Sequence, residues 1–209
     1  MPAPSFCRLC RFSPKINGQI NDYGYRWSAV YSYDVNMFTQ TTATTTAPFA
    51  VSNWTSAPLR LEKQVWLKTS VKEAFEALSN PTRWPQLFPW IQKVTVDNET
   101  AVIPNGLGAK RICHFGNGLV LEDIIVGWEP PHRYAYAGVD ETHPFGMVGY
   151  VALVVCQAAA SGLAHLQWQH FFDHPNPQMM IKRLEVNLET AVCHLIERYG
   201  GYSENKNTN

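Results

Sequence analysis

The stretch NPQMMIKRLEVNLETAVCHLIERYGG, residues 176–201, decides the fold. Asn176 and Pro177 predict a helix start, because an Asn side chain accepts a hydrogen bond from a free amide of the first turn and Pro is tolerated at the first helical position. Gly200 and Gly201 supply the left-handed backbone on which helices commonly end. Between them one apolar face recurs at steps of three and four: Met180, Leu184, Leu188, Ala191, Leu195 and Tyr199. Such a helix must pack this face against another element.

The preceding chain predicts that the partner is an antiparallel sheet. Turn signals, and no helical pattern, separate the strand-like segments 93–101, 108–115, 119–129, 132–139, 149–158 and 164–172. The strongest hairpin signal is Gly116-Asn-Gly118. Strands that follow one another without intervening helices pair as antiparallel neighbours rather than as parallel units joined by helices.

A first strand and two short helices are predicted before these segments. Residues 59–68 alternate between apolar and polar side chains. Ser70 and Glu73 then form a capping box, and Asn80-Pro81 repeats the start signal of the last helix. The second short helix runs into the proline-rich aromatic segment Trp84–Ile91. The sequence therefore predicts an α+β fold with a curved antiparallel sheet of about seven strands around a long C-terminal helix.

Composition divides the chain into an ordered domain, residues 58–201, and two tails. Residues 1–57 have no persistent period and contain the threonine-rich run 39–47, so we expect a disordered or loosely packed extension. An organellar transit peptide, or an over-long reading frame with Met37 as the true start, are the alternatives. Residues 202–209 are expected to be a disordered tail. Without organellar import, we expect the protein in the cytoplasm.

Charge and cysteine content exclude several classes of protein. Basic and acidic residues number 17 each, so nothing indicates a nucleic-acid surface. The five cysteines include one CxxC, Cys7 to Cys10, which lacks the second pair of a zinc site. Residues 146–164 carry no charge, but their glycines and β-branched centre favour a buried strand over a membrane-spanning helix. We therefore expect no integral membrane segment.

The order of elements resembles the START-like, or SRPBCC, superfamily, which includes the birch-pollen-allergen-like helix-grip proteins. More narrowly, it is similar to the polyketide cyclase/dehydrase and lipid-transport family. The resemblance covers about residues 59–201 and rests on motifs at Val71–Leu78, Trp84-Pro85, Pro89–Ile91, Gly106–Arg111, Trp128–Tyr136, Leu166–Trp168, Phe171-Phe172 and the closing helix. It implies a cavity between sheet and helix that holds a lipid, a quinone or a polyketide-like molecule. A cavity is implied more firmly than a reaction, because one fold supports many functions.

The last strand predicts which side chains face this cavity. Leu166, Trp168, His170 and Phe172 share the more apolar face, so we expect them to point inward. His170 is then either a hydrogen-bonded core residue, a polar anchor for a ligand, or a general acid or base. One of the neighbouring residues Glu122 and Asp123 must also point inward, and the sequence leaves open which one. A buried carboxylate needs a partner, for which His114 is the candidate.

These observations define the candidate site. The expected ligand-binding residues are Trp84, Trp90, His114, Tyr134, Tyr136, Trp168, His170, Met180 and Leu184. The candidates for catalysis are His170, Asp123 and Tyr136. No cofactor is expected, and no metal, because alternation places His165 and His170 on opposite faces of their strand.

The favoured hypothesis is a protein that binds a hydrophobic small molecule without an assigned reaction, makes at most transient contact with a membrane, and binds no nucleic acid. One alternative is an enzyme of the polyketide cyclase or dehydratase type, which would use the His, Tyr and carboxylate groups of the cavity. The other is a chaperone for isoprenoid quinones, towards which the aromatic segment Trp84–Ile91 leans.

Overall fold

The computed structural model describes residues 49–139 and 143–204. The predicted α+β fold is confirmed, with a long C-terminal helix and short helices after the first strand. The elements in chain order are η2 (Val51–Asn53), β1 (Leu59–Leu67), α1 (Val71–Ser79), η3 (Pro81–Arg83), α2 (Trp84–Leu87), β2 (Ile91–Asp97), β3 (Lys110–Phe115), β4 (Val120–Glu129), β5 (Arg133–Gly138), β6 (Val148–Ala158), η5 (Ala160–Gly162), β7 (Ala164–Asp173), α3 (Pro177–Tyr199) and β8 (Gly201–Glu204).

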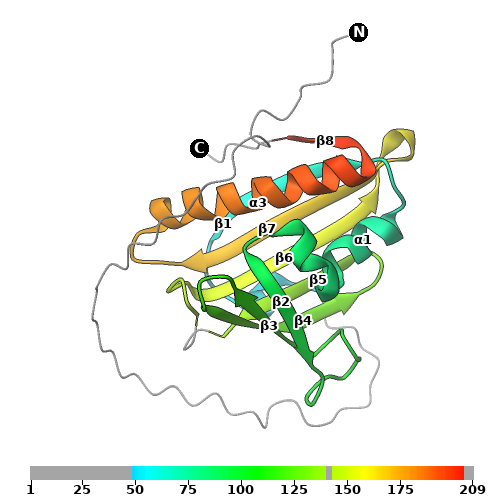
Figure 1. Cartoon of the computed structure of the whole chain (residues 1–209). Helices are drawn as coiled ribbons and strands as arrows, with labels where there is room; N and C mark the ends of the chain where they lie inside the picture. Colours follow the sequence, from blue (N-terminus) through cyan, green and yellow to red (C-terminus); the bar gives the residue numbers. More distant parts are fainter. Residues whose placement is uncertain (1–48, 140–142, 205–209) are drawn as a thin grey trace, which may run out of the picture.

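The strands form one antiparallel sheet of eight strands in the order β2-β3-β4-β5-β6-β7-β1-β8. Neighbours from β2 to β7 follow one another along the chain, as expected for hairpins. The turn between β3 and β4 lies at the predicted position, where Gly118 adopts a φ of 84° that favours glycine. Since β1 returns to pair with β7, the sheet presents one continuous face to α3, which lies along it (Figure 1).

The helix α3 begins and ends at the predicted residues. The Asn176 side chain accepts a hydrogen bond from the Met179 amide at 3.1 Å, and Gly200 ends the helix with a φ of 70°. The predicted apolar face is buried at Met180, Leu188, Ala191 and Leu195, and partly buried at Leu184 and Tyr199.

One ion pair joins α3 to the sheet. Lys63, on the inner face of β1, lies 3.2 Å from the carboxylate of Glu189, which the helical pattern placed outside the apolar stripe. The Lys63 side chain is 6% exposed and that of Glu189 is 22% exposed. The buried face of α3 is therefore wider than its apolar residues indicate.

At the C-terminus, strand structure continues past residue 201, where the sequence analysis placed the end of the domain. Residues 201–204 form β8, which pairs with β1 from Gln64↔Glu204 to Leu67↔Gly201, and the ring of Tyr202 stacks on that of Trp66 at 5.0 Å. The ordered domain therefore extends to Glu204. Residues 205–209 lie outside the described part of the chain.

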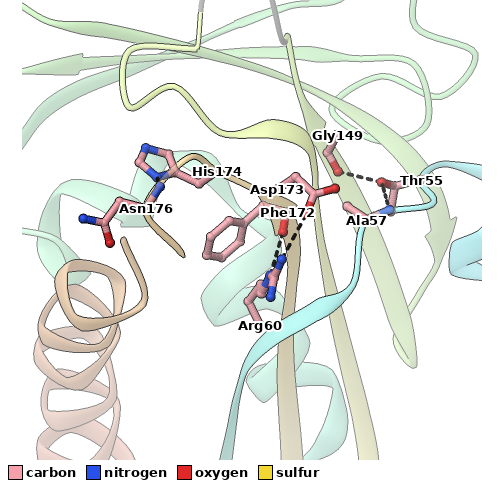
Figure 2. Close-up of polar contacts among 8 residues, drawn as sticks. All are labelled: Thr55, Ala57, Arg60, Gly149, Phe172, Asp173, His174 and Asn176. Carbon is pink, nitrogen blue, oxygen red and sulfur yellow. Dashed lines mark hydrogen bonds and ion pairs between the residues drawn. The ribbon is translucent and has the colours of Figure 1, made fainter. Parts of the chain in front are cut away.

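At the N-terminus, residues 49–57, which precede the boundary predicted from the sequence, contact the sheet. A Cβ atom on Gly127 of β4 would come within 2.6 Å of the Phe49 ring and within 2.7 Å of the Trp54 ring, so only glycine fits beneath them. The Thr55 hydroxyl donates a hydrogen bond to the carbonyl oxygen of Gly149 at 2.7 Å (Figure 2). The predictions for residues 1–48, including the transit peptide and the CxxC, lie outside the described residues.

Further polar contacts hold the end of β7 beside β1. Arg60 donates hydrogen bonds to the Phe172 carbonyl oxygen at 3.1 Å and to the Asp173 carboxylate at 3.0 Å (Figure 2). The Asn176 amide donates to Nδ1 of His174 at 2.9 Å, where the chain turns from β7 into α3. These contacts fix where the long helix begins relative to the sheet.

The uncharged segment 146–164 forms β6 and the turn that follows it, as the sequence predicts. Within residues 49–139 and 143–204, no helix combines the length and the apolar character that are needed to cross a bilayer.

Candidate ligand-binding site

A cavity of about 90 Å³ lies between the sheet, α2, the segment 143–147 and the first half of α3. Its wall is mostly aromatic and aliphatic, with a few polar groups. It is lined by Trp84, Phe88, Trp90, Ile91, Phe115, Leu121, Asp123, Tyr136, His143, Phe145, Met147, Tyr150, Trp168, His170, Met180, Arg183, Leu184, Asn187 and Leu188.

The helix α2 and the residues after it form the aromatic wall. Asn80 caps η3, which leads directly into α2, by accepting a hydrogen bond from the Thr82 amide at 3.0 Å. The indole of Trp84 donates a hydrogen bond to the carbonyl oxygen of Leu78 at 2.7 Å, which fixes its ring. Phe88 meets Trp168 of β7 edge to face, with ring centroids 6.0 Å apart. The wall is therefore held from both the helical segment and the sheet.

A buried ion pair forms part of the polar end of the site. Arg111 of β3 and Asp123 of β4 are register partners, and Nε of the arginine lies 2.6 Å from Oδ1 of the aspartate. The two side chains are 0% and 1% exposed. The guanidinium lies 4.2 Å from the ring centroid of Trp84 and 4.1 Å from that of Tyr136, at cation–π distance. Burial raises the pKa of Asp123, and the charge of Arg111 opposes that rise.

The ion pair is incompletely hydrogen-bonded. Among the described residues, Oδ2 of Asp123 and both terminal nitrogens of Arg111 have no hydrogen-bond partner. Asp123 lines the cavity, whereas Arg111 does not. The free carboxylate oxygen is therefore the part of the pair that a ligand can meet.

His170 is the second polar group of the wall. Its Nδ1 lies 3.0 Å from the hydroxyl of Tyr150, and its Nε2 has no hydrogen-bond partner among the described residues. Burial lowers the pKa of His170 to about 3, so the imidazole is neutral at pH 7. Burial also raises the pKa of the neighbouring Tyr136 to about 12, against the opposing effect of Arg111. The polar end thus holds neutral His and Tyr groups beside the ion pair.

The structure places most sequence-predicted residues on this one cavity. Those that line it are Trp84, Trp90, Asp123, Tyr136, Trp168, His170, Met180 and Leu184. The predicted alternation of β7 is confirmed, because Leu166, Trp168, His170 and Phe172 are all buried.

Two predicted residues do not line the cavity. Arg111 and Cys113 occupy the buried face of β3, and His114 alternates to the other face, so it does not contact Asp123. Tyr134 is fully buried, but it packs beside the rings of Phe75, Trp128 and Tyr136 and does not itself line the cavity.

The partner of the inward carboxylate was also predicted wrongly. Asp123 points inward and pairs with Arg111, whereas Glu122 lies on the opposite face, 3.5 Å from Lys110. Arg111 lies inside the predicted strand 108–115 and shares a face with the apolar Cys113, and this parity was the available signal that its side chain points inward. The sequence analysis also missed Arg183, whose guanidinium lies 4.9 Å from the ring centroid of Phe145 at the cavity wall.

No group of three His, Cys, Asp or Glu side chains that could hold a metal ion occurs within the described parts of the chain.

The family described as polyketide cyclase / dehydrase and lipid transport matches residues 58–199. An uncharacterised protein of Mycobacterium tuberculosis is 31% identical over 81 residues, which make up 39% of this chain and 47% of that protein. An uncharacterised protein of Mycobacterium bovis matches with the same figures. The chain thus spans about half the length of the curated relatives it matches.

Solved structures share the fold at low sequence identity. XoxI from Bacillus cereus has a TM-score of 0.56 at 10% identity, and the match covers 66% of this chain and 93% of XoxI. A protein from Thermobifida fusca has a TM-score of 0.52 at 21% identity, and the match covers 67% of this chain and 92% of the Thermobifida protein. The di-domain ARO/CYC StfQ from the steffimycin biosynthetic pathway has a TM-score of 0.50 at 13% identity, and the match covers 66% of this chain and 50% of StfQ. At these identities the likeness establishes the fold alone.

Proposed function

The chain belongs to the polyketide cyclase/dehydrase and lipid-transport family, and on this premise we propose that it binds a hydrophobic small molecule between its sheet and α3. One observation carries the proposal: an apolar cavity into which a few polar groups, among them Asp123 and His170, converge. A mostly apolar wall with a small number of placed polar groups is typical of small-molecule sites.

The size of the cavity restricts how a ligand binds. At about 90 Å³ it is smaller than the roughly 300–1,000 Å³ of sites for drug-sized ligands. We therefore expect one ring or a short apolar segment to occupy the space, with any longer chain passing the rim. To admit a larger ligand, the flexible side chains of Leu184 and Met180 on α3 would change conformation more readily than the packed aromatic rings on the sheet side of the cavity.

An enzyme of the cyclase or dehydratase type is the second candidate. It is favoured because Asp123, Tyr136 and His170 line the same cavity. The pKa values of two of these groups argue against a catalytic role, since burial lowers the pKa of His170 to about 3 and raises that of Tyr136 to about 12. A general acid or base works best with a pKa near the working pH. Binding without a reaction is therefore better supported.

A substitution at His170 separates the two candidates. In a carrier, His170→Asn should change affinity by the value of about one hydrogen bond, roughly 0.5–1.5 kcal/mol. In an enzyme the same change should lower turnover by roughly 10²–10⁴-fold while binding is largely kept. His165→Ala, on the opposite face of β7, is the control and should do neither.

Binding itself can be tested with N-phenyl-1-naphthylamine, a neutral probe whose emission rises in apolar surroundings. We expect saturable binding of one probe per chain, and native mass spectrometry of protein purified from its source should show one bound molecule. Leu184→Trp, which fills the cavity from α3, should weaken probe binding at least ~10-fold. Val186→Trp, on the exposed side of the same helix, should leave it unchanged. Absence of saturable binding, or equal effects of both variants, would overturn the proposal.

A further inference from the structure

The polar end of the cavity offers a ligand an acceptor oxygen and hides the matching cation. Asp123 lines the cavity and uses only Oδ1 in its ion pair, which leaves Oδ2 without a hydrogen-bond partner among the described residues. Arg111 is 0% exposed, does not line the cavity, and lies at cation–π distance from the rings of Trp84 and Tyr136. A bound molecule therefore reaches the carboxylate oxygen before any part of the guanidinium.

An unpartnered buried carboxylate oxygen selects for a hydrogen-bond donor. Leaving such an acceptor without a donor costs free energy, because its hydration has been lost and nothing replaces it. A ligand that presents only acceptors, such as a carboxylate, an ether or a quinone carbonyl, would place its lone pairs against those of Asp123. A ligand that donates a hydrogen bond removes the cost.

The charge of the pair decides between neutral and charged donors. Arg111 lies 2.6 Å from Oδ1, so the two formal charges cancel within the site. An ammonium group would face the guanidinium nearby and gain little net attraction. His170, which also lines the cavity with an unpartnered Nε2, adds no charge, since burial lowers its pKa to about 3. The surroundings therefore suit a neutral donor.

We propose that the ligand is a hydroxyl-bearing aromatic molecule whose neutral hydroxyl group donates a hydrogen bond to Oδ2 of Asp123. The inference rests on the proposed binding function and names the chemical class of the ligand. The aromatic part of the ligand follows from the wall, where the rings of Trp84, Phe88, Trp90 and Trp168 provide flat surfaces for an aromatic ring. The hydroxyl follows from the unpartnered oxygen. Free fatty acids and fully oxidised quinones fall outside this class.

Three naphthalenes that differ in one substituent test the proposal on the wild-type chain. At pH 7, 2-naphthol is a neutral donor, 2-methoxynaphthalene is an acceptor only, and 2-naphthoate is an anion. Each is used to displace N-phenyl-1-naphthylamine. We expect 2-naphthol to bind at least ~10-fold more tightly than either of the others, as a hydrogen bond to a charged acceptor implies.

The outcomes separate this inference from the proposed function. If the probe itself does not bind, the binding function fails. If the probe binds and 2-methoxynaphthalene or 2-naphthoate equals or exceeds 2-naphthol, the hydroxyl proposal is overturned while the binding function stands.

Two matched double variants test which residues carry the preference. Arg111→Met with Asp123→Leu removes both charges together, so no unpaired charge remains in the core. Whatever its effect on the affinity of the probe, it should bring the affinity ratio of 2-naphthol to 2-methoxynaphthalene towards one. Lys110→Met with Glu122→Leu removes the neighbouring pair on the opposite face of the same strands and should keep the wild-type ratio. An unchanged ratio in the first variant would overturn the proposal.

Discussion

The buried His170 should make the protein less stable as the pH falls from 7 to 5. Its side chain is fully buried on β7, and burial lowers its pKa from 6.5 to about 3. The titratable and charged groups around it are Tyr150, which lies 3.0 Å from Nδ1, and Asp123, Tyr136, His143 and Arg183 on the cavity wall. Since the carboxylate of Asp123 already pairs with Arg111, a proton on the imidazole would add an uncompensated charge to a buried site.

The sign and size of the effect follow from linkage. Between pH 6.5 and about 3 the unfolded chain binds a proton at this position and the folded chain does not. Stability is therefore fully present above pH 6.5 and is lost as the pH falls towards 3. For a pKa that falls from 6.5 to about 3, the free energy of unfolding at pH 5 should be about 2 kcal/mol lower than at pH 7. His143, whose pKa burial lowers to about 4, contributes in the same direction.

Urea unfolding followed by tryptophan fluorescence at pH 7, 6 and 5 measures the effect. Because His143 and the carboxylates also titrate, the informative quantity is the difference between the wild type and His170→Asn. The variant should lose about 2 kcal/mol of the pH dependence between pH 7 and 5, whatever its absolute stability. The exposed His132→Asn is the control and should keep the full dependence. The same pH dependence in the wild type and in His170→Asn would refute the reasoning.

The ion pair and the N-terminal segment give two further predictions. Asp123→Leu alone should lower the free energy of unfolding by about 3–5 kcal/mol, because Arg111 would remain charged and buried. Adding Arg111→Met should restore most of this loss. Urea unfolding measures the stability of both variants, and an Asp123→Leu variant as stable as the wild type would contradict this reasoning. A chain that starts at Pro58 should melt more than ~5 °C below the full chain, because it lacks residues 49–57, which pack on β4. Equal melting temperatures of the two chains in calorimetry would show that this packing adds no stability.

Local signals determined the helices and most strands. The caps at Ser70, Asn80 and Asn176 all form as predicted, since each depends on hydrogen bonds within a few residues of chain. The alternation of β7 likewise predicted that His170 faces the cavity, because parity along a strand follows directly from the backbone. These features need no knowledge of what lies across the sheet.

Strand register decided the polar end of the site. Arg111 and Asp123 are 12 residues apart, and they meet only because β3 and β4 pair in the register that places them opposite each other. With apolar residues on both sides of the pair Glu122-Asp123 in the sequence, the orientation of Asp123 was not predictable, and the sequence analysis named only His114 as its candidate partner. A shift of one residue would have turned every side chain of the strand to the other face.

Tertiary packing alone decided the ends of the domain. Residues 49–57 carry no period, and they are held because the missing side chain of Gly127 leaves room for two rings. Residues 201–204 become β8 only because β1 offers them an open edge. Within the sequence these segments resemble solvated tails, since the groups that satisfy their backbones and bury their rings lie far away along the chain. The sequence by itself thus determined the elements and the inward face of β7, whereas the three-dimensional structure decided the pairing of the buried charges and the limits of the fold.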